Sequence, residues 1–191
     1  MHLTSPCRTL QAALQLTRPG GEVRSLYSAD HGYVTINQAV TVLGAHGATG
    51  VLATNVSGVT INAGANDVVT LKGLEIDGGG SGVNGIKFNS GAALNVQDSV
   101  IRGFATGISF QPKATSSFSV SGTILSNNTT GILFQTSTAS TGVLSDAQLI
   151  NNGSGAVVQG ASSASVASLT VQNGSSPTTA RWGFFRMVIR S

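Results

Sequence analysis

Apolar residues recur about every 24 residues along most of this chain, the kind of fixed period that marks a repeat architecture in which each unit stacks on the next. Three columns share the period and predict three short strands per coil. The first reads Leu26, Val51, Ile76, Ile101, Leu125 and Leu149; the second reads Ile36, Ile61, Ile86, Ile108, Ile132 and Ala156; the third reads Val69, Leu94 and Phe118 and drifts to Val143.

Two short motifs fill these columns. The first places a threonine between two apolar residues, so the threonine is expected to face outward because side chains alternate along a strand. The second begins with a glycine, where we expect a corner with positive φ, which glycine adopts without steric penalty. The first motif is VTI (34–36), VTV (40–42), VTI (59–61) and VTL (69–71); the second is GIKF, GISF, GILF and GAVV, starting at Gly85, Gly107, Gly131 and Gly155.

Amide side chains keep the same register. One amide follows each copy of the second motif, and amides stacked at one offset can hydrogen-bond along the stack, so a structural ladder is predicted. The pair Asn127 and Asn128 recurs 24 residues later as Asn151 and Asn152 and predicts a structural corner, because asparagine tolerates left-handed turns. The predicted ladder is Asn89, Gln111, Gln135 and Gln159.

The first residues differ from the rest and predict a capping helix over residues 5–18. Thr4 or Ser5 would cap its start and Pro6 suits the first helical position. Its apolar face would be Leu10, Ala13, Leu14 and Thr17, and Pro19-Gly20-Gly21 would end it. Such a helix would cover the exposed first coil.

The 191 residues therefore predict one all-β domain, a single-stranded right-handed parallel β-helix with coils over residues 22–176. Residues 177–191 abandon the Gly/Ser/Asn composition for WGFFRMVIRS and form an atypical C-terminal tail. Three interpretations of this tail stay open: a last strand covering the open end, a non-native terminus, or an edge that pairs two chains.

Composition excludes several classes of protein. The net charge is +3 and no dense basic stripe precedes the tail, so nucleic-acid binding is not expected. No run of 18 apolar residues predicts a membrane span, and no secretory leader opens the chain. Cys7 is the only cysteine, which rules out an internal disulfide; we expect it to be buried as a small apolar residue.

Outward-facing charge is sparse, and one cluster is a candidate for chemistry. Glu75 and Asp77 flank the inward Ile76, Arg102 falls one coil beyond Asp77, and Lys72 is near in sequence. The cluster Lys72, Glu75, Asp77 and Arg102 is either a degenerate polysaccharide-cleaving site or an exposed ion pair, and the residues favour the ion pair. His31 and His46 share no spacing typical of a metal site, and no cofactor motif is present.

The stretch SPCRTLQAALQLTRPGGEV and the segment GLEIDGGGSGVNGIKFNSGAALNVQDSVIRGF resemble the pectate-lyase-like β-helix superfamily, and most of all bacterial right-handed β-helix repeat proteins of unassigned function. The resemblance covers roughly residues 5–175 and implies the fold and an exported, secreted or cell-surface location. The NTD, DD and GHG motifs of polygalacturonases, and the aspartate run of a pectate lyase calcium site, are missing.

These observations favour a non-catalytic solenoid acting as a scaffold or a weak glycan-binding surface, with polysaccharide as its partner. The first alternative is a minimal polysaccharide lyase or hydrolase that uses Asp77, Glu75 and Arg102. The second alternative is an assembly module that associates through its tail or its open coil ends.

Overall fold

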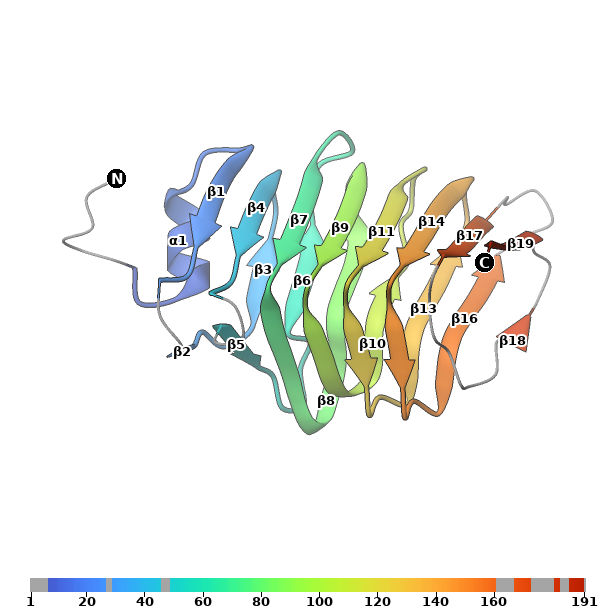
Figure 1. The fold of residues 1–191 in the computed structure, drawn as a ribbon. Helices are drawn as coiled ribbons and strands as arrows, with labels where there is room; N and C mark the ends of the chain where they lie inside the picture. Colours follow the sequence, from blue (N-terminus) through green and yellow to red (C-terminus); the bar gives the residue numbers. More distant parts are fainter. Residues whose placement is uncertain are drawn as a thin grey trace.

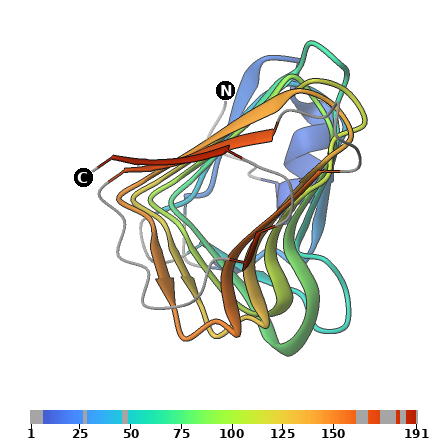
Figure 2. The same cartoon turned by 90° about the vertical axis from the view of Figure 1, so that its right-hand side faces the viewer.

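The chain folds as a solenoid of parallel β-strands with one short helix at its N-terminal end (Figure 1). The structure is a computed structural model and describes residues 7–26, 29–45, 49–160, 167–172, 181–182 and 186–190. Viewed down the axis, successive coils superimpose around a common interior (Figure 2). Every strand pair is parallel, which confirms the predicted β-solenoid class.

Two sheets wrap this interior. Sheet A has eight strands in spatial order: β1 (Gly21–Arg24), β4 (Val40–Leu43), β7 (Val68–Lys72), β9 (Ala93–Gln97), β11 (Ser117–Ser121), β14 (Ser140–Ser145), β17 (Ala167–Gln172) and β19 (Arg186–Arg190). The main path of sheet B runs in the order β18 (Arg181–Trp182), β16 (Ser154–Gly160), β13 (Thr130–Thr136), β10 (Val100–Phe110), β8 (Leu74–Ser90), β5 (Thr49–Leu52) and β2 (Ala29–Asp30). Beside this path, β6 (Val59–Asn62) pairs with β8 and with β3 (Val34–Ile36), and β12 (Ile124–Ser126) pairs with β10 and with β15 (Gln148–Ile150).

Inward side chains of like kind stack from coil to coil. Val51, Ile76, Ile101 and Leu125 follow one another in register and are fully buried. Beside them the rings of Phe88, Phe110 and Phe134 stack, with centroids 4.7 and 5.1 Å apart. Because each buried apolar side chain stabilises a fold by roughly 1.5–3 kcal/mol, these columns are the main stabilising element.

Leu26 does not belong to the first column. It is 45% exposed. Asp30 pairs with Gly50, so the following residue, His31, falls at the register position above Val51. The second column is in register at every step except that from Ile61 to Ile86, where it was wrong by two residues because Ile61 pairs with Phe88 and Val59 with Ile86. The loop inside β8 carries extra residues: Arg102 and Phe104 of β10 pair with Asp77 and Gly82, so β8 holds three more residues than β10 at this point.

The glycines that open the second motif have a different role from the predicted one. None of Gly85, Gly107, Gly131 and Gly155 has positive φ. Instead the backbones of neighbouring coils meet there: a Cβ on Gly107 would lie 2.6 Å from the carbonyl oxygen of Gly131, and one on Gly131 would lie 2.5 Å from that of Gly155. Close coil-to-coil packing therefore requires glycine at these positions.

Positive φ occurs at another corner, directly after the strands of sheet A. Gly73, Asp98, Gly122 and Asp146 follow β7, β9, β11 and β14 and have φ of 67, 48, 55 and 52°. Each donates its backbone N–H to a carbonyl of the next coil, as Asp98 does to Ser121. A single left-handed residue thus turns the chain from sheet A into sheet B.

The third column also ends differently from the prediction. Phe118 pairs with Gly142, and Val143 faces outward with 38% of its surface exposed. A Cβ on Gly142 would meet the side chains of Leu169, Phe134 and Phe118 at 2.6, 3.1 and 3.4 Å. The glycine leaves room for the Phe118 ring, which lies 4.9 Å from the ring of Phe110.

The capping helix is shorter than predicted. Helix α1 spans Leu10–Leu16, and its N-cap is Thr9, whose hydroxyl accepts from the N–H of Ala12; Thr4, Ser5 and Pro6 lie outside the described residues. Leu10 and Leu14 are buried as expected. Gln11 accepts the N–H of Thr35 at 2.8 Å, so the helix satisfies a backbone group at the exposed edge of β3.

Cys7 and the predicted C-terminal tail lie near the two ends of the chain. Cys7 is exposed, not buried, because it precedes the helix and the core. Within the predicted tail, β18 and β19 each extend a sheet by one parallel strand. No helix in the described part of the chain has the length and apolar character needed to cross a membrane.

Candidate functional site

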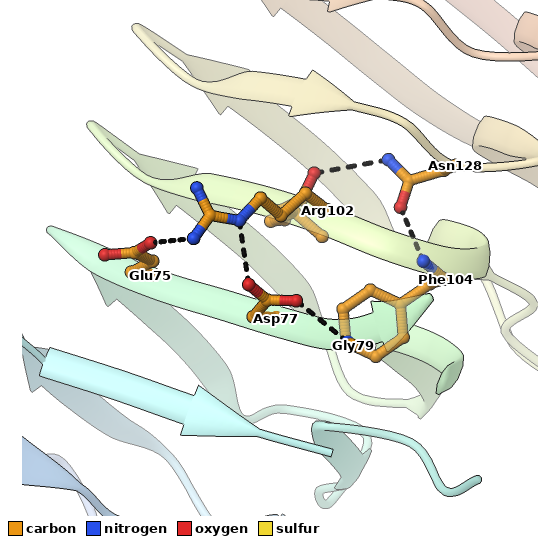
Figure 3. A network of polar contacts seen from close by, with 7 residues as sticks. Glu75, Asp77, Gly79, Arg102, Phe104 and Asn128 are labelled. Atoms are coloured by element: carbon orange, nitrogen blue, oxygen red, sulfur yellow. Dashed lines mark hydrogen bonds and ion pairs between the residues drawn. The ribbon is translucent and has the colours of Figure 1, made fainter. Parts of the chain in front are cut away.

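Three of the four candidate residues meet on the outer surface of sheet B (Figure 3). The Arg102 Nε donates to Asp77 Oδ2 at 2.8 Å, and Arg102 Nη2 lies 2.6 Å from Glu75 Oε1. Glu75 and Asp77 lie on β8 either side of the buried Ile76, and Arg102 pairs with Asp77 in the register of β10. We call these three residues the ion cluster.

Lys72 does not join the ion cluster. It lies at the end of β7 in sheet A, and its Nζ is 3.3 Å from Asp98 Oδ2. Gly73, with φ of 67°, turns the chain between Lys72 and Glu75, so the two side chains leave from different sheets. Proximity in sequence was a poor guide at this corner.

The ion cluster stabilises the charged forms of Asp77 and Arg102. Partial burial alone would raise the pKa of Asp77, but hydrogen bonds from the Gly79 N–H and the Arg102 guanidinium outweigh it and lower that pKa. The hydrogen bond to Asp77 raises the pKa of Arg102 despite its partial burial. Glu75 adds a further favourable charge to Arg102.

This electrostatic balance favours an ion pair in which Asp77 and Arg102 both keep their charges. A general acid needs a carboxyl whose pKa is raised toward neutral pH, and an arginine that acted as a general base would first have to lose its proton. Asp77 is shifted the opposite way and Arg102 is held more firmly protonated. The side chains are also 33–44% exposed, so solvent screens them and the contacts are those of a surface ion pair.

One pair of the predicted amide ladder is joined by a hydrogen bond, and a second member bonds to an amide outside the prediction. Gln111 Nε2 donates to Gln135 Oε1 at 2.6 Å, and Asn89 Nδ2 donates to Asn62 Oδ1 at 2.9 Å. Gln135 and Gln159 are in register on β13 and β16. Within the described residues no side-chain hydrogen bond joins Asn89 to Gln111 or Gln135 to Gln159.

A continuous buried network lies at the corner beneath the ion cluster, where the recurring asparagines had predicted a structural turn. Asn128 Oδ1 accepts the N–H of Phe104, while its Nδ2 donates to the carbonyl of Ile101 and to Asn152 Oδ1 (Figure 3). Asn152 repeats the arrangement by donating to the carbonyl of Leu125. Their preceding residues, Asn127 and Asn151, have φ of 55 and 53°, as predicted for this corner.

The outer face of sheet A is the surface that residue-by-residue reading missed. Most of its half-exposed outward side chains carry an uncharged hydroxyl or amide, and they line up in two files because the strands are in register. The outward residues of each strand carry this pattern in the sequence, but it contains few charged residues and no motif typical of a site. The face comprises Thr41, Thr70, Asn95, Ser119, Val143 and Thr170 in one file and Leu43, Lys72, Gln97, Ser121, Ser145 and Gln172 in the other.

Metal-binding groups are sparse. No group of three or more His, Cys, Asp or Glu side chains that could hold a metal ion occurs within the residues the structure describes. His31 Nε2 lies 3.1 Å from Ser25 Oγ, and its buried Nδ1 has no hydrogen-bond partner. His46 lies outside the described residues.

One comparison with known proteins finds a match. The model of a family described as "Periplasmic copper-binding protein (NosD)" matches residues 36–178, more than half of the 191 residues. No curated protein and no solved structure matches the chain.

Proposed function

Because the chain belongs to the NosD family, whose description is of a periplasmic protein, we propose that it is an exported, non-catalytic β-helix that binds polysaccharide weakly. The outer face of sheet A is the proposed binding surface. The observation that carries the proposal is the in-register alignment of uncharged hydroxyl and amide side chains across β4, β7, β9, β11, β14 and β17.

The chemistry of this face suits sugars with many hydroxyl groups. Neighbouring strands of a sheet lie about 4.8 Å apart, so an extended glycan laid along the axis meets equivalent groups at a regular spacing. Each hydrogen bond made there replaces one to water and contributes only about 0.5–1.5 kcal/mol. No aromatic side chain occurs at the outward positions named for the face, so binding without sugar stacking is expected to be weak.

Neutral polysaccharides are the expected ligands. Among the positions named for the face Lys72 is charged, and Asp98 neutralises it at 3.3 Å. On the neighbouring strand β1 the exposed Glu22 and Arg24 neutralise each other at 3.3 Å. A face without net charge offers little to attract a polyanion and no repulsion toward a neutral chain. Affinity electrophoresis in gels containing a neutral or an acidic polysaccharide is the matching assay, and we expect retardation by the neutral one.

A substitution that places a bulky cation in the middle of the face tests whether this surface, and not another part of the molecule, binds the glycan. Ser119→Arg is expected to weaken retardation about tenfold, equivalent to 1.4 kcal/mol, because it displaces a flat ligand from the central rungs. The matched control is Thr129→Arg at an exposed corner outside sheet A. Equal retardation of both variants and of the wild-type chain contradicts the proposal.

The ion cluster argues against the enzymatic alternative. Both of its carboxylates contact one guanidinium, and the pKa of Asp77 is lowered, which disfavours the protonated acid that glycoside cleavage requires. Incubation with acidic and neutral polysaccharides is expected to leave chain length unchanged and to produce no unsaturated ends. Cleavage that is lost in Asp77→Asn would instead establish the lyase or hydrolase function.

Self-association is the second candidate function. It is supported by β19, which is the last strand of sheet A in the described part of the chain and pairs only with β17. A strand with one unpaired edge can pair with another chain. Deleting residues 178–191 and measuring the mass by light scattering tests this: an unchanged monomer mass excludes the tail as an assembly site.

A further inference from the structure

The copper in the family's description has no matching set of ligands in the described coils of this chain. Copper(II) prefers several imidazole nitrogen and oxygen donors in a planar arrangement, and copper(I) prefers thiolate and thioether sulfur. A site of either kind requires at least two or three such groups to converge. Within the described residues no three His, Cys, Asp or Glu side chains do so.

His31 is the one histidine among the residues that the structure describes. It follows β2, and its N–H donates to the carbonyl of Gly50 at 3.0 Å. Its Nδ1 is buried without a hydrogen-bond partner, so one nitrogen is available to a ligand, but its Nε2 already lies 3.1 Å from Ser25 Oγ. One imidazole nitrogen provides a single ligand.

The carboxylate next to His31 is already engaged. Asp30 Oδ1 accepts the N–H of Gly32 at 2.9 Å and that of Leu52 at 3.1 Å. These two bonds fix the turn after β2 and direct the carboxylate to the backbone. Asp30 therefore does not complete a site with His31.

The other acidic side chains of the early and central coils are likewise committed. Asp67 accepts the N–H of Gly64. Each of the other carboxylates contacts a lysine or an arginine. A metal ion would have to displace these partners before binding. The pairs are Glu22 with Arg24, Glu75 and Asp77 with Arg102, and Asp98 with Lys72.

We propose that the described residues of the coils, 21–26, 29–45, 49–160 and 167–172, form no copper site, so this part of the chain has the fold of its family without a copper-binding role. The inference is independent of the glycan proposal, because it concerns the interior and corners of the coils and not the outer face of sheet A. Any copper that the full chain binds is then held by groups outside these described residues.

The test is copper stoichiometry on the full chain. Wild-type protein and His31→Gln are each loaded with copper(II) sulfate, or with copper(I) in competition with a chromogenic chelator, and the copper retained per chain is measured after desalting. We expect the wild-type protein and His31→Gln to retain the same amount of copper per chain, including the case in which neither retains any. Loss of one equivalent in His31→Gln overturns the proposal, whether or not a parallel His46→Gln sample keeps it.

A second measurement needs no variant and guards against a His31→Gln chain that does not fold. Copper(II) broadens the NMR signals of nearby amides because it is paramagnetic. In wild-type protein the amides of Ser25, Gly50 and Val51 are expected to stay sharp on addition of one equivalent. Selective broadening of these three amides would place copper at His31 and contradict the inference.

Discussion

The outer face of sheet A and the ion cluster of sheet B are built from outward positions of the same coils, yet their polar groups are arranged differently. On sheet A, uncharged groups such as those of Asn95 and Ser119 stand side by side in register. On sheet B, Glu75 and Asp77 each contact the Arg102 guanidinium, at 2.6 and 2.8 Å. The first surface leaves hydroxyls and amides in contact with solvent, whereas the second satisfies its charges internally.

The difference shows that register alone does not make a site. Both surfaces inherit their alignment from the stacked coils, but only the sheet A face keeps groups that a ligand could bind without first breaking ion pairs. The ion cluster also contributes little to the fold, because the strand that carries Arg102 is already held by the buried Asn128 beneath it.

The largest expected effect is at that buried corner. Asn128→Ala removes the partners of the Phe104 N–H and the Ile101 carbonyl, so we expect unfolding in urea to require about 3 kcal/mol less free energy, since each buried unsatisfied group costs about 1–3 kcal/mol. The matched control is Asn95→Ala on the sheet A face, where the amide is half-buried and its bond to Thr70 is 3.3 Å long. Equal losses in the two variants would mean that burial does not separate the interior from the outer face.

The next effect tests the close approach of the coils. Gly107→Ala would place a methyl group 2.6 Å from the Gly131 carbonyl oxygen, and we expect a loss of about 1–3 kcal/mol from overpacking. Ser121→Ala on the sheet A face is expected to change stability by less than about 0.5 kcal/mol. Thermal melts followed by circular dichroism measure both. A Gly107→Ala chain as stable as the control would show that the backbones can separate freely.

A smaller effect is expected from the ion cluster itself. Arg102→Ala should lower the free energy of unfolding by only about 0.2–1 kcal/mol, because exposed ion pairs are screened by water. The loss should shrink further at high salt, where screening is stronger. A salt-independent loss as large as that of Asn128→Ala would contradict the description of the cluster as surface.

The smallest effect is the pH dependence due to Asp77. Its pKa is lowered in the folded chain, so the charged form stabilises the fold above its unfolded pKa of about 3.9, and that contribution is lost as the pH falls through the lower folded value. The stability difference between wild-type protein and Asp77→Asn should therefore be constant from neutral pH to about pH 5 and shrink below about pH 4. A difference that changes between pH 6 and 8 would point to another group.

Much of the fold could be predicted from the sequence because stacking requires like residues at a fixed spacing. The column Val51, Ile76, Ile101 and Leu125 was predicted correctly, as were the outward threonines and the asparagine corner. The second column slipped by two residues at Phe88 because the period does not reveal which side of the coil carries the extra residues of the β8 loop. The glycine role was misassigned because a positive φ and a close backbone approach leave the same residue in the sequence.

The candidate site was predictable only in part for the same reason. Asp77 and Arg102 were brought together by register, and Glu75 by alternation along one strand. Lys72 was misplaced because one left-handed glycine moves it onto the other sheet. Cys7 was expected in the core from its residue type, but its position ahead of Thr9 and helix α1 leaves it exposed.

The most direct test of the proposed glycan-binding face is amide chemical-shift mapping of the wild-type chain during titration with a soluble neutral oligosaccharide. The predicted result is a continuous band of shifted amides across β7, β9, β11 and β14, with those of Glu75, Asp77 and Arg102 unchanged. Shifts confined to the ion cluster, or no saturable shift anywhere on sheet A, would contradict the account.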